Sequence, residues 1–186
     1  MSRFTVTGTP LSGLKVIERQ RMQDARGFLS RLFCFEELQQ AGWQDPVVQI
    51  NHTLTRRRGA LRGMHFQNAP HAEIKLVSCL RGEIFDVAVD LRADSATFLR
   101  WHAEHLSSDN GRVLLIPEGF AHGFQALSDD CELIYLHNQA HASASEGGVN
   151  AIDPRVGIEW PLPITERSDR DRGFSFLSPA YPGLSK

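Results

Sequence analysis

The sequence lacks any long apolar run, and this absence excludes a membrane-spanning helix. No apolar stretch in its 186 residues approaches the ~20 residues that a helix needs to cross a bilayer. The first residues, MSRFTVTGTPLSG, contain no apolar core of a secretory signal, so we expect no signal peptide. These two absences predict a cytoplasmic protein with no membrane partner.

Cysteine is scarce, and the few cysteines present do not form a framework. Cys34, Cys79 and Cys131 are far apart in apolar surroundings and show no C-x-x-C spacing. An odd, scattered set fits reduced core thiols better than disulfide bonds. This pattern again favours the cytoplasm.

An excess of positive charge is missing as well. The formal net charge is −2, so the chain has no electrostatic footprint for nucleic acid. The basic run Arg56-Arg57-Arg58 is only three residues long and is typical of a solvated turn. With 41% apolar and 23% charged residues, the chain has the composition of one ordinary globular domain over residues 1–186.

What the sequence does contain is a series of short, strand-like segments. Most are rich in Val, Ile, Leu and Phe, several alternate with period two, and turn signals such as Arg81-Gly82 separate them. The expected strands span 14–22, 46–55, 60–67, 72–92 (with a turn at 81–82), 97–107, 112–128 (with a turn at 117–119) and 131–137. One short helix is expected over 34–42, with Gly42 as its stop. Many short strands at regular spacing predict an all-β sandwich or barrel.

The C-terminal segment, about residues 161–186, has weak periodicity and many Pro, Asp and Arg residues. A disordered terminus is the simplest interpretation of this composition. However, Trp160, Phe174 and Phe176 suggest that the segment packs back onto the body of the domain.

Eight histidines raise the possibility of a metal site, but their spacing argues against one. Two ligands on one strand face are two residues apart, yet His65 is followed at that spacing by Gln67, a poor ligand. His71 follows a proline and belongs to a loop, and His102 and His105 face opposite sides of a strand. We therefore expect no bound metal.

Polar residues on separate strands form a more coherent set. His65 and Gln67 share a strand face, and Lys75 interrupts an otherwise apolar strand. In GFAHGF, His122 is flanked by the glycines Gly119 and Gly123, which allow close backbone approach, and Tyr135 ends the apolar run CELIY. Each residue alone has an ordinary structural explanation. Together, inward positions on several strands of one barrel predict a ligand cavity.

A histidine, a lysine and a tyrosine in one cavity suit proton abstraction next to a ketone. The histidine removes the proton, the lysine stabilises the enolate oxygen, and the tyrosine returns a proton to the opposite face. The stereocentre is thereby inverted. Because the ketone accepts the electron pair, no cofactor is expected.

Several segments also resemble the dTDP-4-dehydrorhamnose 3,5-epimerase family, in order and with family-like spacing from about Leu14 to Asp171. The segments that carry the resemblance are RGFLSRLF, VVQINHTLT, LRGMHFQ, KLVSCLRGEIFDVAVDLRADSATFLRW, LLIPEGFAHGFQALSDDCELIY and IDPRVGIEWP. The resemblance implies a jelly-roll (cupin-like) β-barrel without metal, with an N-terminal arm of about residues 1–30 and strands exchanged in a homodimer. It also implies inversion of C3 and C5 of a nucleotide-linked 4-keto-6-deoxyhexose, in deoxysugar or polysaccharide biosynthesis.

The resemblance assigns roles to individual residues. His65 matches the general base, Tyr135 the proton donor, Lys75 the lysine near the ketone oxygen, and Asp171 the aspartate that fixes the tautomer of the base. Residues that match or adjoin the family's substrate contacts are Arg26, Phe28, Gln49, Asn51, Arg62, Gln67, His122, Glu146 and Arg170, where Arg170 stands in place of a lysine. Phe28 resembles the aromatic that reaches the nucleobase, in the partner subunit.

The departures from the family pattern concern the nucleobase. Arg31 stands where the family has a glutamate, and Ala140-His141 stand where it has two tyrosines. Ile50 replaces an aspartate, and Ala151-Ile152 replace Trp-Asn. Thymine and uracil donate a hydrogen bond from N3, which a glutamate accepts, whereas cytosine accepts one, which an arginine donates. We therefore expect Arg31 and His141 at the base and a nucleotide other than dTDP, either CDP or GDP, with dTDP held by other contacts as the competing possibility.

Three alternative functions remain open at the level of sequence. The first is a single-site epimerase acting only at C3 or only at C5, whose catalytic residues would look the same. The second is a nucleotide-sugar-binding protein without turnover, against which the joint presence of His65, Lys75, Tyr135 and Asp171 argues. The third is a metal-dependent oxygenase of the cupin class.

Overall fold

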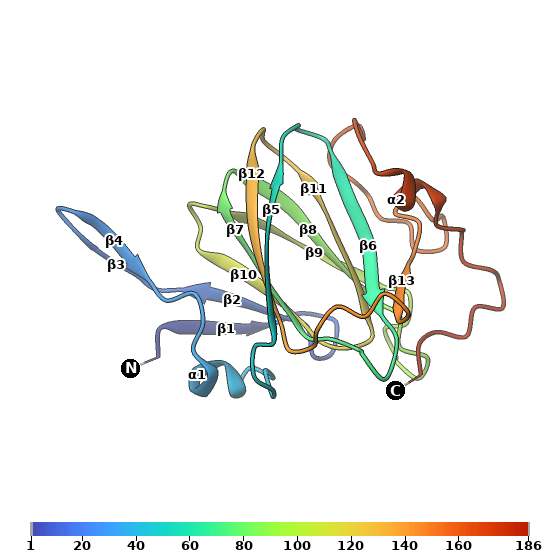
Figure 1. The fold of residues 1–186 in the computed structure, drawn as a ribbon, viewed down its shortest axis with the longest axis horizontal. Coiled ribbons are helices and arrows are strands. Elements are labelled where there is room, and N and C mark those ends of the chain that lie inside the picture. The colour runs from blue at the N-terminus through green and yellow to red at the C-terminus, as the bar shows by residue number, and fades with distance from the viewer. Residues whose placement is uncertain (1, 186) are drawn as a thin grey trace.

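In the computed structural model, residues 2–185 are described, and they form two antiparallel sheets packed face to face (Figure 1). One sheet has six strands, in the spatial order β1 (Phe4–Gly8), β2 (Lys15–Arg19), β10 (Arg112–Ile116), β7 (Lys75–Arg81), β12 (Cys131–His137) and β5 (Gln49–Thr55). The other has five, in the order β13 (Glu146–Gly148), β6 (Leu61–Gln67), β11 (Phe120–Ala126), β8 (Glu83–Asp90) and β9 (Trp101–Ser107). This architecture confirms the predicted all-β jelly-roll fold.

The turn signals of the sequence separate these strands as expected. Gly82 links β7 to β8 with a φ of 74°, a conformation that residues with a side chain rarely adopt. Residues 108–111, 117–119 and 127–130 make the turns between β9 and β10, β10 and β11, and β11 and β12. The predicted strand over 97–107 begins only at Trp101, because the Asp90 carboxylate accepts hydrogen bonds from Ser95 and Thr97 and holds that part as a turn.

A two-stranded ribbon, β3 (Arg21–Asp24) and β4 (Gly27–Ser30), projects from the body (Figure 1). Within the described residues its strands pair with each other and with no other strand. The segment that projects is therefore shorter than the expected arm of residues 1–30, since β1 and β2 belong to the six-stranded sheet. The predicted strand over 14–22 is likewise divided at Gln20, between β2 and β3.

Helices are few and short. The predicted helix over 34–42 is present as α1 (Phe35–Gln39), and a second helix, α2 (Asp169–Gly173), lies in the C-terminal segment. Ser168 caps α2 by accepting a hydrogen bond from the Asp171 amide. Neither helix is long and apolar enough to cross a membrane.

The apolar core has three layers. The central layer fills the space between the sheets and includes Leu114, Phe124 and Leu133. A second layer covers the outer face of the six-stranded sheet, where Leu38 of α1 and Trp43, which follows α1, pack. A third covers the outer face of the five-stranded sheet. Each sheet is thus buried on both faces over much of its area.

The C-terminal segment supplies much of the third layer. Leu177, Tyr181 and Leu184 pack against that outer face, together with Trp160. Phe174 lies edge-on to His65 at 5.9 Å between ring centroids, whereas Phe176 is 56% exposed and does not pack as expected. The segment is therefore anchored to the sheet, and it brings α2 next to β6.

Candidate active site

The cavity arises where the inward-facing residues of the strands change from apolar to polar. Along β12 these residues are, in order, Cys131, Leu133, Tyr135 and His137. Along β7, read in the opposite direction, they are Cys79, Val77 and Lys75. Because β7 and β12 are antiparallel neighbours, the apolar ends coincide in the core and the polar ends coincide at the cavity.

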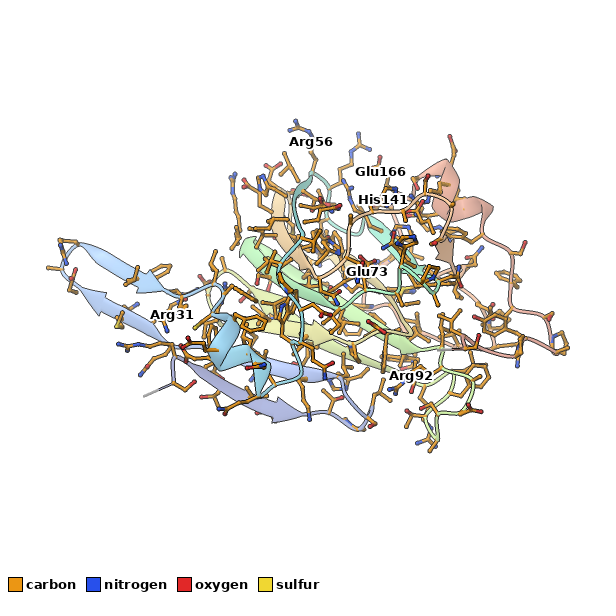
Figure 2. The ribbon with its side chains drawn as sticks, turned by 60° about the horizontal axis from the view of Figure 1, so that its bottom comes forward. Arg31, Arg56, Glu73, Arg92, His141 and Glu166 are labelled. Atoms are coloured by element: carbon orange, nitrogen blue, oxygen red, sulfur yellow. The ribbon has the colours of Figure 1, made fainter. Side chains whose placement is uncertain are left out.

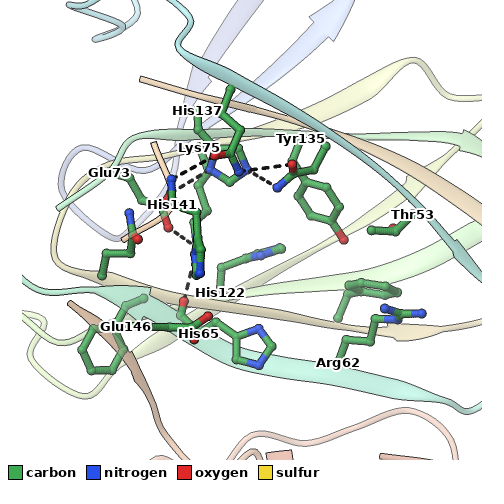
Figure 3. A pocket seen from close by; sticks show the side chains of 15 residues that line it. Thr53, Arg62, His65, Glu73, Lys75, His122, Tyr135, His137, His141 and Glu146 are labelled. Carbon is green, nitrogen blue, oxygen red and sulfur yellow. Dashed lines mark hydrogen bonds and ion pairs between the residues drawn. The ribbon is translucent and has the colours of Figure 1, made fainter. Parts of the chain in front are cut away.

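Most of the predicted site residues line this one cavity. Three are predicted catalytic residues, His65, Lys75 and Tyr135. Seven are predicted binding residues, namely Gln49, Asn51, Arg62, Gln67, His122, His141 and Glu146. Figure 3 shows His65 on β6 facing residues of the six-stranded sheet, so the two sheets supply opposite walls.

His65 is held by Asp171, which lies behind it on α2. His65 Nε2 is 2.7 Å from Asp171 Oδ1, and the other carboxylate oxygen accepts a hydrogen bond from the Gly63 amide at 3.1 Å. Burial opposes ionisation of Asp171, but these hydrogen bonds outweigh it and hold the pKa of that carboxyl below its usual range. An ionised Asp171 fixes the Nε2–H tautomer and leaves the lone pair on Nδ1 of His65 to accept a proton.

A bulge in β6 explains how Arg62 and His65 both reach the cavity, although strict alternation would separate them. His122 pairs with His65 while Phe124 pairs with Arg62, so β6 has one residue more than β11 between these points. The strands approach so closely here that a Cβ on Gly63 would lie 2.5 Å from the Gly123 Cα. Glycine at both positions is what permits the bulge.

Tyr135 and Lys75 lie on the wall opposite His65. Burial raises the pKa of Tyr135, so its hydroxyl remains a neutral donor over the working range of pH. The Lys75 side chain is only 9% exposed, and its Nζ lies 3.4 Å from the His65 carbonyl oxygen. Lys75 therefore lines the cavity and does not extend along the surface.

His122 belongs to a second histidine–carboxylate pair. Its Nε2 lies 2.7 Å from Asp86 Oδ1, and its ring meets Tyr135 edge-on at 5.9 Å between centroids. Asp86 is fully buried, and burial raises the pKa of its carboxyl. The inward position of Asp86, between Ile84 and Ala88 on β8, was available in the alternation of EIFDVAVDL but did not by itself indicate a site.

Gln67 lines the cavity, but its side chain is engaged with the backbone. Its amide nitrogen donates to the carbonyl oxygens of His71 and Ala140, and its oxygen accepts from the Ala142 amide at 2.7 Å. These bonds hold the loop after β12, which carries His141 into the cavity. The His141 amide in turn donates to Gln49 Oε1 at 2.9 Å.

A basic cleft adjoins the cavity beyond His65 and Arg62. Five arginines line this basic cleft, namely Arg56, Arg57, Arg62, Arg167 and Arg170. Arg170 Nη2 also pairs with Glu146 Oε1 at 2.7 Å, which links the cleft to the cavity rim. A concave surface with this charge is suited to a diphosphate.

Three predicted binding residues line neither the cavity nor the basic cleft of their own chain. Arg26 pairs with Asp24 at the tip of the ribbon, and Phe28 lies under the Arg21 guanidinium and is 57% exposed. Arg31 pairs with Glu37 of α1, well away from Glu73 and His141 in Figure 2. Within one chain, these residues cannot contact a ligand in the cavity.

The structure also separates the departures from the family pattern. His141 lines the cavity, but Ile50 lies on the outer face of β5, where it is 59% exposed. Ala151 is buried in the third core layer, and Ile152 is exposed. These positions do not lie together within a single chain, so their place around the nucleobase stays a prediction.

Three polar residues of the cavity were missed from the sequence, Thr53 on β5, Glu73 and His137. His137 lies two residues after Tyr135 on the same strand face, a spacing that could have indicated it. Glu73 precedes β7, but it lies within the expected strand over 72–92 and two residues before Lys75, a spacing that could have indicated it as well. Among residues 2–185, no group of three or more His, Cys, Asp or Glu side chains is arranged to hold a metal ion.

Comparisons with known proteins match this geometry over nearly the whole chain. A family model described as dTDP-4-dehydrorhamnose 3,5-epimerase matches residues 8–178. The chain is 40% identical over 180 residues to dTDP-4-dehydrorhamnose 3,5-epimerase of Shigella flexneri, covering 96% of this chain and 99% of that one. It is 34% identical over 171 residues to dTDP-4-dehydrorhamnose 3-epimerase of Streptomyces niveus, covering 91% and 82%.

A solved structure shows the same arrangement. The crystal structure of dTDP-6-deoxy-D-glucose-3,5-epimerase from Legionella pneumophila, in complex with dTDP-4-keto-L-rhamnose, superposes with a TM-score of 0.88 at 36% identity. The match covers 93% of this chain and 92% of that one. The similarity therefore includes both sheets.

Proposed function

The chain belongs to the dTDP-4-dehydrorhamnose 3,5-epimerase family, and we propose that it inverts C3, C5 or both in a nucleotide-linked 4-keto-6-deoxyhexose. Membership of this family makes the protein an isomerase. The observation that carries the proposal is the opposition of two walls, with the His65–Asp171 pair on one and Tyr135 and Lys75 on the other. A sugar ring between these walls has a base on one face and an acid on the other.

The proposed reaction proceeds through an enolate. His65 Nδ1 takes the proton from the carbon next to the ketone, the C–H electron pair forms a C=C bond, and the carbonyl electrons move to the oxygen. An N–H of Lys75 stabilises that oxygen as its charge develops. The electrons then return, Tyr135 gives its hydroxyl proton to the opposite face of the carbon, and both side chains exchange protons with solvent.

The nucleoside diphosphate is proposed to extend from the cavity over the basic cleft. Arg62 lines both the cavity and the cleft, and Arg170 reaches the rim through Glu146. Planar guanidinium groups match the oxygens of a diphosphate in geometry and charge. The substrate class is therefore a nucleoside-diphospho-sugar.

The identity of the nucleotide is the finer part of the proposal. We expect CDP or GDP to bind at least as tightly as dTDP, because Arg31 offers donors where a thymine-binding glutamate would accept. In one chain Arg31 pairs with Glu37 near α1, so it would meet the base only in a dimer. Calorimetric titration with dTDP, CDP and GDP tests this expectation, and clearly tightest binding of dTDP would contradict it.

A homodimer is proposed on the same grounds. The ribbon exposes Phe28 and Leu29, and β5, an edge strand of the six-stranded sheet, exposes Ile50, so apolar side chains lie uncovered on both elements. A second copy of the chain would cover them and could bring Arg26 and Phe28 to the partner's cavity. Light scattering of the intact protein measures the oligomeric state.

The reaction is tested by solvent isotope exchange. The protein is incubated in D₂O with dTDP-4-keto-6-deoxyglucose, and deuterium at C3 and C5 is followed by NMR. Exchange with inversion at both carbons indicates a 3,5-epimerase, whereas exchange at C3 alone indicates the single-site activity named for the Streptomyces niveus relative. Binding without exchange at either carbon would overturn the proposed function for this sugar.

A further inference from the structure

A third histidine–carboxylate pair lies in the cavity and has no part in the proposed reaction. Glu73 Oε2 is 2.7 Å from His137 Nδ1, and Glu73 Oε1 is 2.9 Å from Lys75 Nζ (Figure 3). The side chains of Glu73, Lys75 and His137 are each about one-tenth exposed. One buried carboxylate therefore bridges the cavity's lysine and an imidazole.

This bridge limits what the Lys75 ammonium can do. An ammonium group has three N–H donors. One is directed to Glu73 Oε1, and another reaches the His65 carbonyl oxygen at 3.4 Å. A single N–H is left for a ligand in the cavity, and the two fixed bonds determine its direction.

His137 is itself fixed on both sides. Its Nδ1–H donates to Glu73, and its Nε2 lies 3.4 Å from Asn51 Nδ2, whose N–H can donate to it. Asn51 Oδ1 accepts from Gln49 Nε2 at 3.2 Å, so all donors in this chain of bonds run in one direction. With both ring nitrogens engaged, His137 has no free site for proton transfer and serves as a support for Glu73.

Glu73 is ionised under all ordinary conditions. Its burial opposes ionisation, but the hydrogen bond from His137 and the charge of Lys75 outweigh that effect and lower its pKa to about 2. A permanent negative charge thus lies next to the ammonium. A flexible lysine stem would otherwise leave that ammonium free to occupy many positions.

We propose that Glu73, supported by His137, is a positioning residue that holds the Lys75 ammonium with one N–H directed at the ketone oxygen of the substrate. This inference rests on the epimerisation proposed above. Glu73 acts through Lys75 and does not touch the reacting carbon. Its role is to fix the donor that stabilises the enolate before the charge develops.

The test compares Glu73→Gln with a matched control elsewhere on the same sheet. Glu132 also bridges a histidine and a cation, His52 and Arg81, but on the exposed surface of β12. We expect Glu73→Gln to lower kcat for deuterium exchange by about 10- to 100-fold, since a lost donor to an oxyanion costs up to ~10³-fold. In Glu73→Gln, KM and the Kd for dTDP should stay within about 3-fold of the wild-type values. Glu132→Gln should change none of kcat, KM and Kd by more than about 2-fold.

Two further variants separate positioning from a structural role. In a Lys75→Met background, Glu73→Gln should cause little additional loss, because the group it positions is absent. Glu73→Asp keeps the charge but is one methylene shorter, so its kcat should lie between those of wild type and Glu73→Gln. If Glu73→Gln fails to fold, Glu73→Asp with its smaller expected loss in kcat takes its place.

The outcomes distinguish this inference from the proposed function. If wild type exchanges deuterium but Glu73→Gln retains its kcat, the positioning role is wrong and the epimerase function stands. Equal losses of kcat in the wild-type and Lys75→Met backgrounds would also overturn the positioning role, because they would show an effect independent of Lys75. If wild type itself does not exchange, the proposed function fails first.

Discussion

The cavity and the β3–β4 ribbon both carry residues expected to contact the substrate, but only the cavity fixes its residues with bonds from its own chain. In the cavity, His65, His122 and His137 each meet a carboxylate at 2.7 Å. On the ribbon, Arg26 and Phe28 interact with neighbours on the same ribbon and are otherwise exposed. The difference indicates that the cavity is preorganised within one chain, whereas a contact between the ribbon and a cavity would require the second copy proposed above.

The largest effect is expected from removing the base. His65→Ala should lower kcat by ~10²–10⁴-fold, because it removes the proposed base, which Asp171 holds in place at 2.7 Å. The Kd for a nucleoside diphosphate, measured by calorimetry, should remain close to that of wild type. An unchanged rate of epimerisation would show that the cavity is not organised around His65.

Tyr135→Phe should separate exchange from inversion. With the hydroxyl gone, His65 can still remove a proton and return deuterium to the same face, so exchange in D₂O continues while inverted product falls by roughly 10²-fold. NMR of the recovered sugar measures both quantities in one sample. If exchange and inversion were lost in parallel, Tyr135 would do more than return a proton to the opposite face.

Acid should weaken the cavity through Glu73. The folded-state pKa of Glu73 is lowered from 4.5 to about 2, so its ionised form stabilises the fold above pH 4.5, and this contribution is lost as the pH falls toward 2. A shift of this size corresponds to at most about 3 kcal/mol in the free energy of unfolding. Urea denaturation of wild type and Glu73→Gln from pH 7 to pH 2.5 should show their difference shrinking on acidification, and a constant difference would contradict this account.

Removing side chains from the ribbon should have the smallest effect on the chemical step. Arg26→Ala with Phe28→Ala should raise KM by about 10-fold and leave kcat within about 3-fold, since these residues can only bind a ligand held by a partner. Mixing this variant with His65→Ala gives a matched control, because a mixed dimer would contain one cavity with both its base and an intact ribbon. No recovery of KM in the mixture would argue that the ribbon does not serve a partner's cavity.

The sequence predicted much of the fold and the cavity, and the reasons are visible in particular residues. Period-two alternation correctly placed Tyr135 and Lys75 on the inward faces of their strands. The turn expected at Gly82 is present as well. Alternation failed at Arg62, because a bulge changes the register of β6. It also placed Glu73, two residues before Lys75 in the expected strand over 72–92, on the cavity face, but the prediction of the site left Glu73 out.

The family resemblance added what periodicity cannot contain. The contact between His65 and Asp171 joins residues 106 positions apart, and α2 lies in a segment whose composition gave no strand or helix pattern. The same resemblance led to the expectation that Ile50 and Ile152 lie near the nucleobase, which stays a prediction, since both side chains are exposed on their own chain. The local sequence pattern thus predicted on which face of a strand a side chain lies, whereas contacts between distant residues could be seen only in the folded structure.

The measurement that tests the central claim most directly is a crystal structure of the protein with a nucleoside-diphospho-4-keto-6-deoxyhexose bound. We predict that the sugar ring lies between His65 and Tyr135, with the ketone oxygen ~3 Å from Lys75 Nζ and the diphosphate over the basic cleft. A sugar ring bound outside the cavity, or with both His65 and Tyr135 on the same face of the ring, would contradict this account.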